Sequence, residues 1–207
     1  MKIKICGITR KEDALLCSKY GADAIGFIFY PKSKRYITPV AAKDIVHSLP
    51  AFTMKIGVFV NEDIGVVNRI AHLVGLNSVQ LHGDESPEYV EQMTHPVIKS
   101  FGVDELFDFS KVNNYKNCNI LLDVKDDKEF GGTGKSFDWN LIPEDLRNKV
   151  IIAGGVSSNN IKEIYSAIHS GAVDLSSSVE ISHGIKDKNK IIEVLNIIKQ
   201  IKQNEHE

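Results

Sequence analysis

The chain has 207 residues, of which 43% are hydrophobic, and carries a formal net charge of −2. This length suits one large domain or two small ones, whose core needs neither disulfides nor metals. The nearly even charge offers no basic patch for a nucleic acid, and no apolar run approaches the roughly 18 residues of a membrane span, so neither partner is expected.

The three cysteines, Cys6, Cys17 and Cys118, are odd in number and far apart in the sequence. They form no CxxC pair and no disulfide framework, so they are predicted to be free thiols. Free thiols are typical of a reducing compartment, which predicts a cytoplasmic protein. The histidines show no spacing typical of metal ligands, so no metal is expected.

Eight short runs rich in β-branched residues predict strands. In chain order they cover residues 2–6, 24–29, 54–60, 78–82, 97–101, 119–123, 150–154 and 172–176. Strands that alternate with helices predict a parallel sheet with crossover helices, and eight such units close into a (β/α)8 TIM barrel. We therefore predict a single barrel domain over residues 1–207, with an open doubly wound sheet as the weaker alternative.

Helix signals lie between most of these runs. Thr9 and Gly21 are the expected start and stop of the first helix, and Ser86 is expected to begin another before the fifth strand. One helix is predicted to end at Gly171, and an amphipathic helix over 188–203 closes the chain.

Polar residues occur where several of the predicted strands end. Cys6 ends the first strand, Gln80 and His82 share one face of the fourth, and Asp123 ends the sixth. Active sites of barrels lie at the carboxyl ends of the strands, so these side chains are expected at the barrel mouth. Taken singly, Cys6 also fits an inert core thiol, His82 a structural histidine and Asp123 a turn cap.

The loops after strands seven and eight are the usual phosphate site of such barrels. Strand seven ends in Gly154 and Gly155, which allow the backbone to approach a ligand closely. Strand eight leads into a serine run, where a short helix is expected to begin and hydroxyl and N–H groups are available. The run comprises Ser176, Ser177 and Ser178. Together the two loops predict a phosphate site, whereas a diglycine alone is often only a turn.

Two further loops are unusual in composition. In residues 30–37, Lys32 and Lys34 are expected to be solvated, whereas the planar guanidinium of Arg35 suits a substrate carboxylate. Residues 124–139 are long, charged and glycine-rich, which predicts a mobile flap over the mouth, with an ordinary surface excursion as the alternative.

Seven segments together resemble the phosphoribosylanthranilate isomerase family of tryptophan biosynthesis. They occur in the family's order and span residues 2 to about 187: "KICGIT", "GADAIGFIFYPKSKRYI", "GVFVN", "VQLHGDE", "LLD" with "GGTGKSFDW", "AGGV" and "VDLSSSVE". The resemblance implies a (β/α)8 barrel without cofactor or metal. It also implies an Amadori rearrangement of a small molecule, N-(5-phosphoribosyl)anthranilate, to 1-(2-carboxyphenylamino)-1-deoxyribulose 5-phosphate. The sequence is compatible with a monomer or a homodimer.

The resemblance places the catalytic cysteine at Cys6 and the catalytic aspartate at Asp123, and it implies that Arg35 binds the anthranilate carboxylate. The expected substrate-binding residues are Arg35, Gln80, His82, Gly154, Gly155, Asp174, Ser176, Ser177 and Ser178. One position departs from the family pattern "SSGVE", because Ser178 replaces its glycine. Serine is strained there if the position needs a positive φ, and otherwise offers the phosphate an extra hydrogen bond.

The expected mechanism is general acid–base catalysis. A protonated Asp123 donates to the ring oxygen, and Cys6 as thiolate then removes the proton from the second ribose carbon. Lys4, two residues earlier on the same strand face, is expected to lower the pKa of Cys6. Gly7 is expected to leave room for the substrate above the sulfur.

Two alternatives stay open. One is a related phosphate-binding barrel, of the indole-glycerol-phosphate synthase type or the tryptophan synthase α subunit type. Those enzymes use lysine and glutamate pairs at strand ends, and outside the first strand only Lys99 is a lysine of interest for that role. The other is a non-catalytic phosphosugar-binding barrel, which would lack the pair of Cys6 and Asp123.

Overall fold

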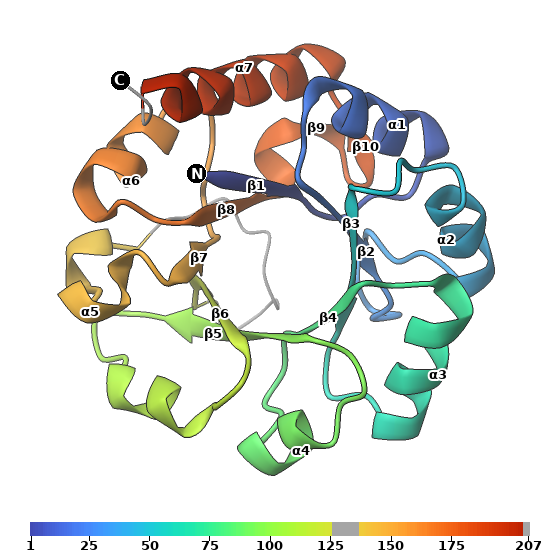
Figure 1. The fold of residues 1–207 in the computed structure, drawn as a ribbon, viewed down its shortest axis with the longest axis horizontal. Helices are drawn as coiled ribbons and strands as arrows, with labels where there is room; N and C mark the ends of the chain where they lie inside the picture. Colours follow the sequence, from blue (N-terminus) through green and yellow to red (C-terminus); the bar gives the residue numbers. More distant parts are fainter. Residues whose placement is uncertain (126–136, 205–207) are drawn as a thin grey trace.

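The computed structural model describes residues 1–125 and 137–204. Eight parallel strands pair in chain order, and the last pairs with the first, so the sheet closes into a barrel (Figure 1). The strands are β1 (Lys2–Ile5), β2 (Ala24–Ile28), β3 (Met54–Phe59), β4 (Ser78–Leu81), β5 (Val97–Val103), β6 (Asn119–Val124), β7 (Val150–Ile152) and β8 (Ala172–Leu175). This topology confirms the predicted single-domain (β/α)8 barrel and rules out the open doubly wound sheet.

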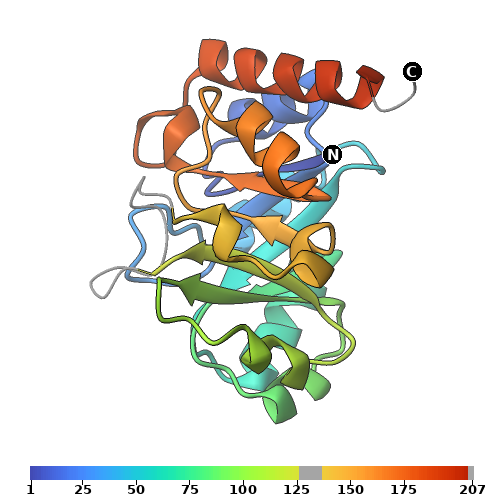
Figure 2. The same cartoon turned by 90° about the vertical axis from the view of Figure 1, so that its left-hand side faces the viewer.

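Helices surround the ring of strands and connect them (Figure 1). The α-helices are α1 (Lys11–Tyr20), α2 (Pro39–Val46), α3 (Ile64–Val74), α4 (Pro87–Glu91), α5 (Glu144–Arg147), α6 (Ile161–Ile168) and α7 (Lys188–Asn204). The 3₁₀ helix η1 (Phe109–Asn114) joins β5 to β6, and η2 (Trp139–Leu141) precedes α5. The side view shows α7 lying along the outside of the barrel, where it packs against α1 and β1 (Figure 2). Among the described helices, none has the length and apolar character needed to cross a membrane.

The strands are apolar on both faces because each lies between the helices and the barrel interior. Outward residues such as Ile3, Ile25 and Val79 belong to the main hydrophobic core beneath the helices. A smaller inward cluster fills the barrel interior with Ala24, Ile56, Ile98, Leu121 and Ala153. Toward the carboxyl ends of several strands the inward residues are polar, which places the reactive side chains at that end of the barrel.

Two of the expected helix boundaries are confirmed. Gly21 stops α1 in the left-handed conformation with φ 103°, and the Ser86 hydroxyl accepts a hydrogen bond from the Tyr89 N–H at the start of α4. Both residues act through local chemistry that is visible in the sequence.

Two other helix boundaries differ from the prediction. Arg10, not Thr9, precedes α1, because the Thr9 hydroxyl donates to the carbonyl of Gly184 at 2.6 Å instead. Helix α6 ends before Gly171, since His169 already adopts φ 47° and closes it. The Thr9 hydroxyl therefore does not cap α1, because it bonds Gly184, a residue distant in the sequence.

An antiparallel hairpin follows β8 and was not predicted. The 3₁₀ helix η3 (Ser177–Val179) confirms the short helix expected after strand eight. It leads directly into β9 (Glu180–Ser182), which pairs with β10 (Ile185–Lys186). The hairpin carries Glu180 and Lys186 as buried charged residues toward the carboxyl end of β1.

Candidate active site

A cavity of about 450 Å³ opens at the carboxyl ends of the strands. Every residue predicted for catalysis or substrate binding lines it. These are Cys6, Arg35, Gln80, His82, Asp123, Gly154, Gly155, Asp174, Ser176, Ser177 and Ser178. They come from both halves of the sequence and meet because the barrel closes. The exposed side chains of Lys32 and Lys34 lie at the same cavity, in agreement with their predicted solvation.

Cys6 follows β1 directly and is only 6% exposed. Burial raises the pKa of its thiol above the ordinary value, although the neighbouring charge of Lys4 lowers it. The predicted direction of the Lys4 effect is therefore right, but the predicted net lowering is wrong. Desolvation disfavours the thiolate more strongly than one already paired ammonium favours it.

Two glycines shape the surroundings of Cys6. A Cβ atom at Gly26 on β2 would lie 2.7 Å from the sulfur, so the absence of a side chain there makes room for the thiol. Gly7 has φ 73°, and a Cβ on it would lie 2.5 Å from Cδ of Arg35. Gly7 thus leaves room for the Arg35 side chain, whereas its expected role of leaving room for the substrate above the sulfur stays a prediction.

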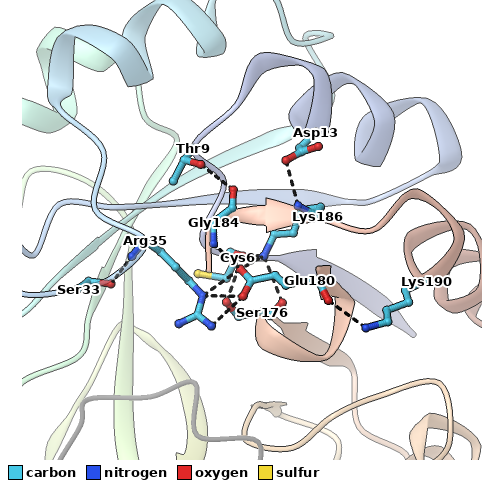
Figure 3. A network of polar contacts seen from close by, with 10 residues as sticks. All are labelled: Cys6, Thr9, Asp13, Ser33, Arg35, Ser176, Glu180, Gly184, Lys186 and Lys190. Carbon is cyan, nitrogen blue, oxygen red and sulfur yellow. Dashed lines mark hydrogen bonds and ion pairs between the residues drawn. The ribbon is translucent and has the colours of Figure 1, made fainter. Parts of the chain in front are cut away.

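Arg35 forms a buried ion pair with Glu180, a residue that was not predicted for the site (Figure 3). Its Nε donates to both carboxylate oxygens at 2.9 and 3.1 Å, and its Nη2 donates to Oε2 at 2.8 Å. Burial would raise the pKa of Glu180, but hydrogen bonds from Arg35 and the charge of Lys186 lower it below its usual range. Among the described residues, Nη1 of Arg35 has no hydrogen-bond partner, so this nitrogen is available at the cavity.

Lys186 joins the hairpin to the first strand (Figure 3). Its ammonium donates to the carbonyl of Cys6 at 2.6 Å, to the carbonyl of Ser176 at 3.2 Å and to Oε1 of Glu180 at 2.9 Å. The only signal in the sequence was two charged residues shortly after an apolar strand. That signal does not distinguish a buried ion pair from a solvated loop.

Asp123 lies on β6 at the cavity wall. Its Oδ1 accepts from the N–H of Val124 at 2.8 Å, and its Oδ2 lies 3.4 Å from Nε2 of His82. A Cβ atom at Gly154 would lie 2.7 Å from Oδ1, which explains a glycine at this position, where φ is 73°. Asp123 and Val124 both lie within β6, so their bond caps no turn and does not support the turn-cap alternative. The approach to His82 places Asp123 in a polar network.

The serine run after β8 lines the cavity next to the glycine loop, which follows the neighbouring strand β7. Ser178 belongs to η3, and the non-glycine residues with positive φ in the described part of the chain are Asn61, Asn117 and His169. The strained alternative for Ser178 is therefore excluded. Its hydroxyl oxygen is buried and has no hydrogen-bond partner among the described residues, which leaves it available to a ligand.

Comparison with known proteins identifies the family. The family model for N-(5'-phosphoribosyl)anthranilate (PRA) isomerase matches residues 3–197. The chain belongs to the phosphoribosylanthranilate isomerase family. An N-(5'-phosphoribosyl)anthranilate isomerase of Thermotoga neapolitana is 44% identical over 199 residues, which cover 94% of this chain and 97% of that protein.

Solved structures agree with this assignment. The crystal structure of phosphoribosyl anthranilate isomerase from Thermotoga maritima superposes with a TM-score of 0.90 at 40% identity, covering 97% of this chain and 99% of that chain. A structure of the family enzyme in complex with reduced 1-(o-carboxyphenylamino)-1-deoxyribulose 5-phosphate gives a TM-score of 0.86 at 40% identity with the same coverage.

The lysine on which the synthase alternative depended lies outside the isomerase cavity. Lys99 is absent from the cavity lining, and its ammonium donates to the carbonyl of Gly83 at 2.6 Å and to Glu85 at 2.9 Å. It therefore has a structural partner at the β4–α4 connection instead of a place beside Cys6 or Asp123.

Two expectations remain predictions. Residues 126–136 of the predicted flap lie outside the described residues. The described residues contain no group of three or more His, Cys, Asp or Glu side chains placed to hold a metal ion. The absence of a metal or cofactor from the reaction stays an expectation that follows from the family resemblance.

Proposed function

We propose that this chain isomerises N-(5'-phosphoribosyl)anthranilate in tryptophan biosynthesis, with Asp123 as general acid and Cys6 as general base. The observation that carries the proposal is a single cavity lined by both residues. The family's complex with a reduced form of the product supports a small sugar phosphate as the ligand. Because β1 and β6 lie on different sides of the barrel, the two groups can act on different sides of one sugar.

The first step opens the ribose ring. A protonated Asp123 donates its proton to the ring oxygen while the bond from that oxygen to the first carbon breaks. The lone pair of the anthranilate nitrogen forms a double bond to this carbon, which gives a protonated Schiff base. The substrate thereby gains a positive charge in a largely buried site, and Asp123 is left as a carboxylate.

The second step moves a proton from the second ribose carbon to Cys6. The cation formed in the first step favours the thiolate, which offsets the burial that raises the pKa of Cys6. The C–H electrons form a double bond between the first two carbons and neutralise the nitrogen. The resulting enolamine becomes the ketone when its first carbon takes up a proton and its hydroxyl loses one.

The two ends of the substrate have separate binding groups. Nη1 of Arg35 is the donor for the anthranilate carboxylate, and Glu180 holds the rest of the guanidinium in place. The phosphate lies between the glycine loop at Gly154 and the serine run, where the Ser178 hydroxyl supplies a donor. This binding needs little net positive charge, in keeping with the chain's net charge of −2.

For the oligomeric state we favour the homodimer over the monomer. The ring of Phe52, in the loop before β3, is 100% exposed, and a second copy would cover it. A solved structure at 38% identity describes the Thermotoga maritima enzyme as dimeric. Sedimentation velocity should give a dimer, and Phe52→Ser should shift it toward a monomer, whereas a monomeric wild type contradicts the proposal. The cytoplasmic location and the absence of a nucleic-acid partner stay predictions.

The activity is tested by following the loss of anthranilate fluorescence when purified protein is added to phosphoribosylanthranilate. Cys6→Ala and Asp123→Ala should each lower kcat by about 10²–10⁴-fold, because each removes one proton-transfer group. Cys118→Ala and Asp44→Ala, which change the same residue types outside the cavity, should retain wild-type rates. Near-normal kcat in Cys6→Ala would refute the base assignment, and a folded wild type without activity would refute the function.

A separate variant tests the carboxylate site. Arg35→Lys keeps the positive charge but loses the planar fork, so it should raise KM more than it lowers kcat. An unchanged KM would mean that Arg35 does not bind the anthranilate carboxylate.

A further inference from the structure

A chain of polar contacts runs from the barrel interior to the wall of the cavity. It begins at Lys4, whose ammonium donates to Oε1 of Gln80 at 2.7 Å. Nε2 of Gln80 lies 2.9 Å from Nδ1 of His82, and Nε2 of His82 lies 3.4 Å from Oδ2 of Asp123. Lys4 also influences the charge of Cys6. The chain therefore connects the surroundings of the proposed base with the proposed acid.

The first member of the chain fixes the direction of the others. Lys4 is 4% exposed and pairs with Asp174 at 2.6 Å. Burial disfavours its ammonium form, but the charges of Asp174 and Cys6 raise its pKa overall, so Lys4 stays protonated. An ammonium group has donors and no acceptor. Gln80 must therefore turn its oxygen toward Lys4.

The orientation of Gln80 in turn determines the tautomer of His82. With its oxygen on Lys4, Gln80 presents its amide N–H to Nδ1 of His82. A donor can meet only an unprotonated ring nitrogen, so the neutral imidazole must carry its hydrogen on Nε2. The reversed amide would set two donors against each other at Lys4. Gln80 is 1% exposed, so water has little access to relieve such a conflict.

We propose that Lys4 and Gln80 are positioning residues that hold His82 as the Nε2–H tautomer, with this N–H directed at the Asp123 carboxyl. The inference rests on the proposed role of Asp123 as the acid. The N–H of Val124 donates to Oδ1 of the same carboxyl at 2.8 Å, and Oδ2 lies 3.4 Å from Nε2 of His82, so each carboxyl oxygen faces one nitrogen. The attraction between this N–H and the carboxyl grows as Asp123 gives up its proton, because hydrogen bonds to charged acceptors are stronger than those to neutral ones.

The protonation of His82 is measured directly by ¹⁵N NMR of the imidazole rings in the folded protein. A His82→Asn variant assigns the signal among the seven histidines. The expected wild-type spectrum shows a protonated Nε2 and an unprotonated Nδ1. A protonated Nδ1 in the wild type would overturn the proposal. This measurement does not depend on turnover, so its failure can be distinguished from a failure of the proposed function.

Gln80→Glu should reverse the protonation of Nδ1 of His82. The new carboxylate still accepts from Lys4 but has no N–H for His82, so Nδ1 should become protonated. We expect kcat to fall about 10–100-fold while KM stays within about twofold, because Asp123 would ionise without the His82 N–H directed at it. An unchanged Nδ1 signal, an unchanged kcat or a rise in KM alone would each overturn the proposal.

Two further variants complete the test. Gln92→Glu makes the same substitution on the exposed α4 end, where Gln92 donates to the carbonyl of Glu88, and it should leave the His82 signal and kcat unchanged. Gln80→Met removes both ends of the link without adding charge, and it serves if Gln80→Glu does not fold. It should give mixed His82 tautomers and a similar fall in kcat, whereas a pure Nε2–H tautomer would overturn the proposal.

Discussion

The sulfur of Cys6 lies against the backbone of Gly26 on the neighbouring strand, where a Cβ atom would approach it to 2.7 Å. The same Cβ would lie 2.9 Å from Cε of Lys4. The positions of the Cys6 and Lys4 side chains thus both depend on the absence of a side chain at Gly26.

Gly26→Ala should displace the thiol and lower kcat by about 100-fold, since a misplacement of about 1 Å can cost that much. Steady-state kinetics with the fluorescence assay measures the effect, and circular dichroism checks that the barrel is retained. Gly65→Ala, on helix α3, is the matched control and should keep the wild-type kcat. Wild-type turnover in folded Gly26→Ala would show that the position of the sulfur is not critical.

Glu180→Gln should destabilise the fold by about 3 kcal/mol, because it leaves Arg35 and Lys186 without their buried counter-charge. The pKa of Glu180 is lowered on folding from its ordinary value of 4.5. The carboxylate therefore stabilises the protein above about pH 4.5, and this contribution is lost as the pH falls through the folded-state pKa.

Urea unfolding between pH 3 and pH 7 measures this stability difference, which should be largest near neutrality and shrink on acidification. Asp104→Asn removes the exposed pair with Lys125 and should cost no more than about 1 kcal/mol. A constant difference at all pH values would mean that the charge of Glu180 is not what stabilises the hairpin.

Ser178→Gly restores the residue typical of the family and removes the buried hydroxyl that has no partner among the described residues. If the hydroxyl donates to the substrate phosphate, KM should rise about tenfold with little change in kcat. Inhibition by inorganic phosphate should weaken in parallel. Ser110→Gly, outside the cavity, controls for the substitution itself. A lower KM in Ser178→Gly would show that the serine obstructs the phosphate.

The buried thiol of Cys6 should react slowly in the absence of substrate. Because burial raises its pKa above the ordinary 9.0, the thiolate is a minor species at neutral pH. Alkylation by iodoacetamide should therefore accelerate about tenfold per pH unit and keep rising beyond pH 9. Peptide mapping by mass spectrometry separates Cys6 from Cys17 and Cys118. A rate that levels off below pH 8 would mean that Lys4 outweighs burial.

The barrel was predictable because its strands are buried on both faces, which leaves a run of apolar residues at each strand. The placement of Cys6 and Asp123 followed from the same pattern, since barrel strands deliver their last residues to the mouth. The ion pair of Arg35 and Glu180 was not predictable, because 145 residues separate the partners and no local periodicity connects them. Thr9 failed as a cap for the same reason, since its partner Gly184 is distant in the sequence.

The bond from Lys186 to the carbonyl of Cys6 also constrains when the site can form during protein synthesis. The cysteine leaves the ribosome 180 residues before Lys186 does. In the nascent chain, the carbonyl of Cys6 has no Lys186 ammonium to accept from until the hairpin has been synthesised. The hairpin then connects the end of the first strand to the end of the eighth. Premature release of the chain before this hairpin should therefore yield a protein that retains Cys6 and Asp123 in its sequence but has not assembled them into a site.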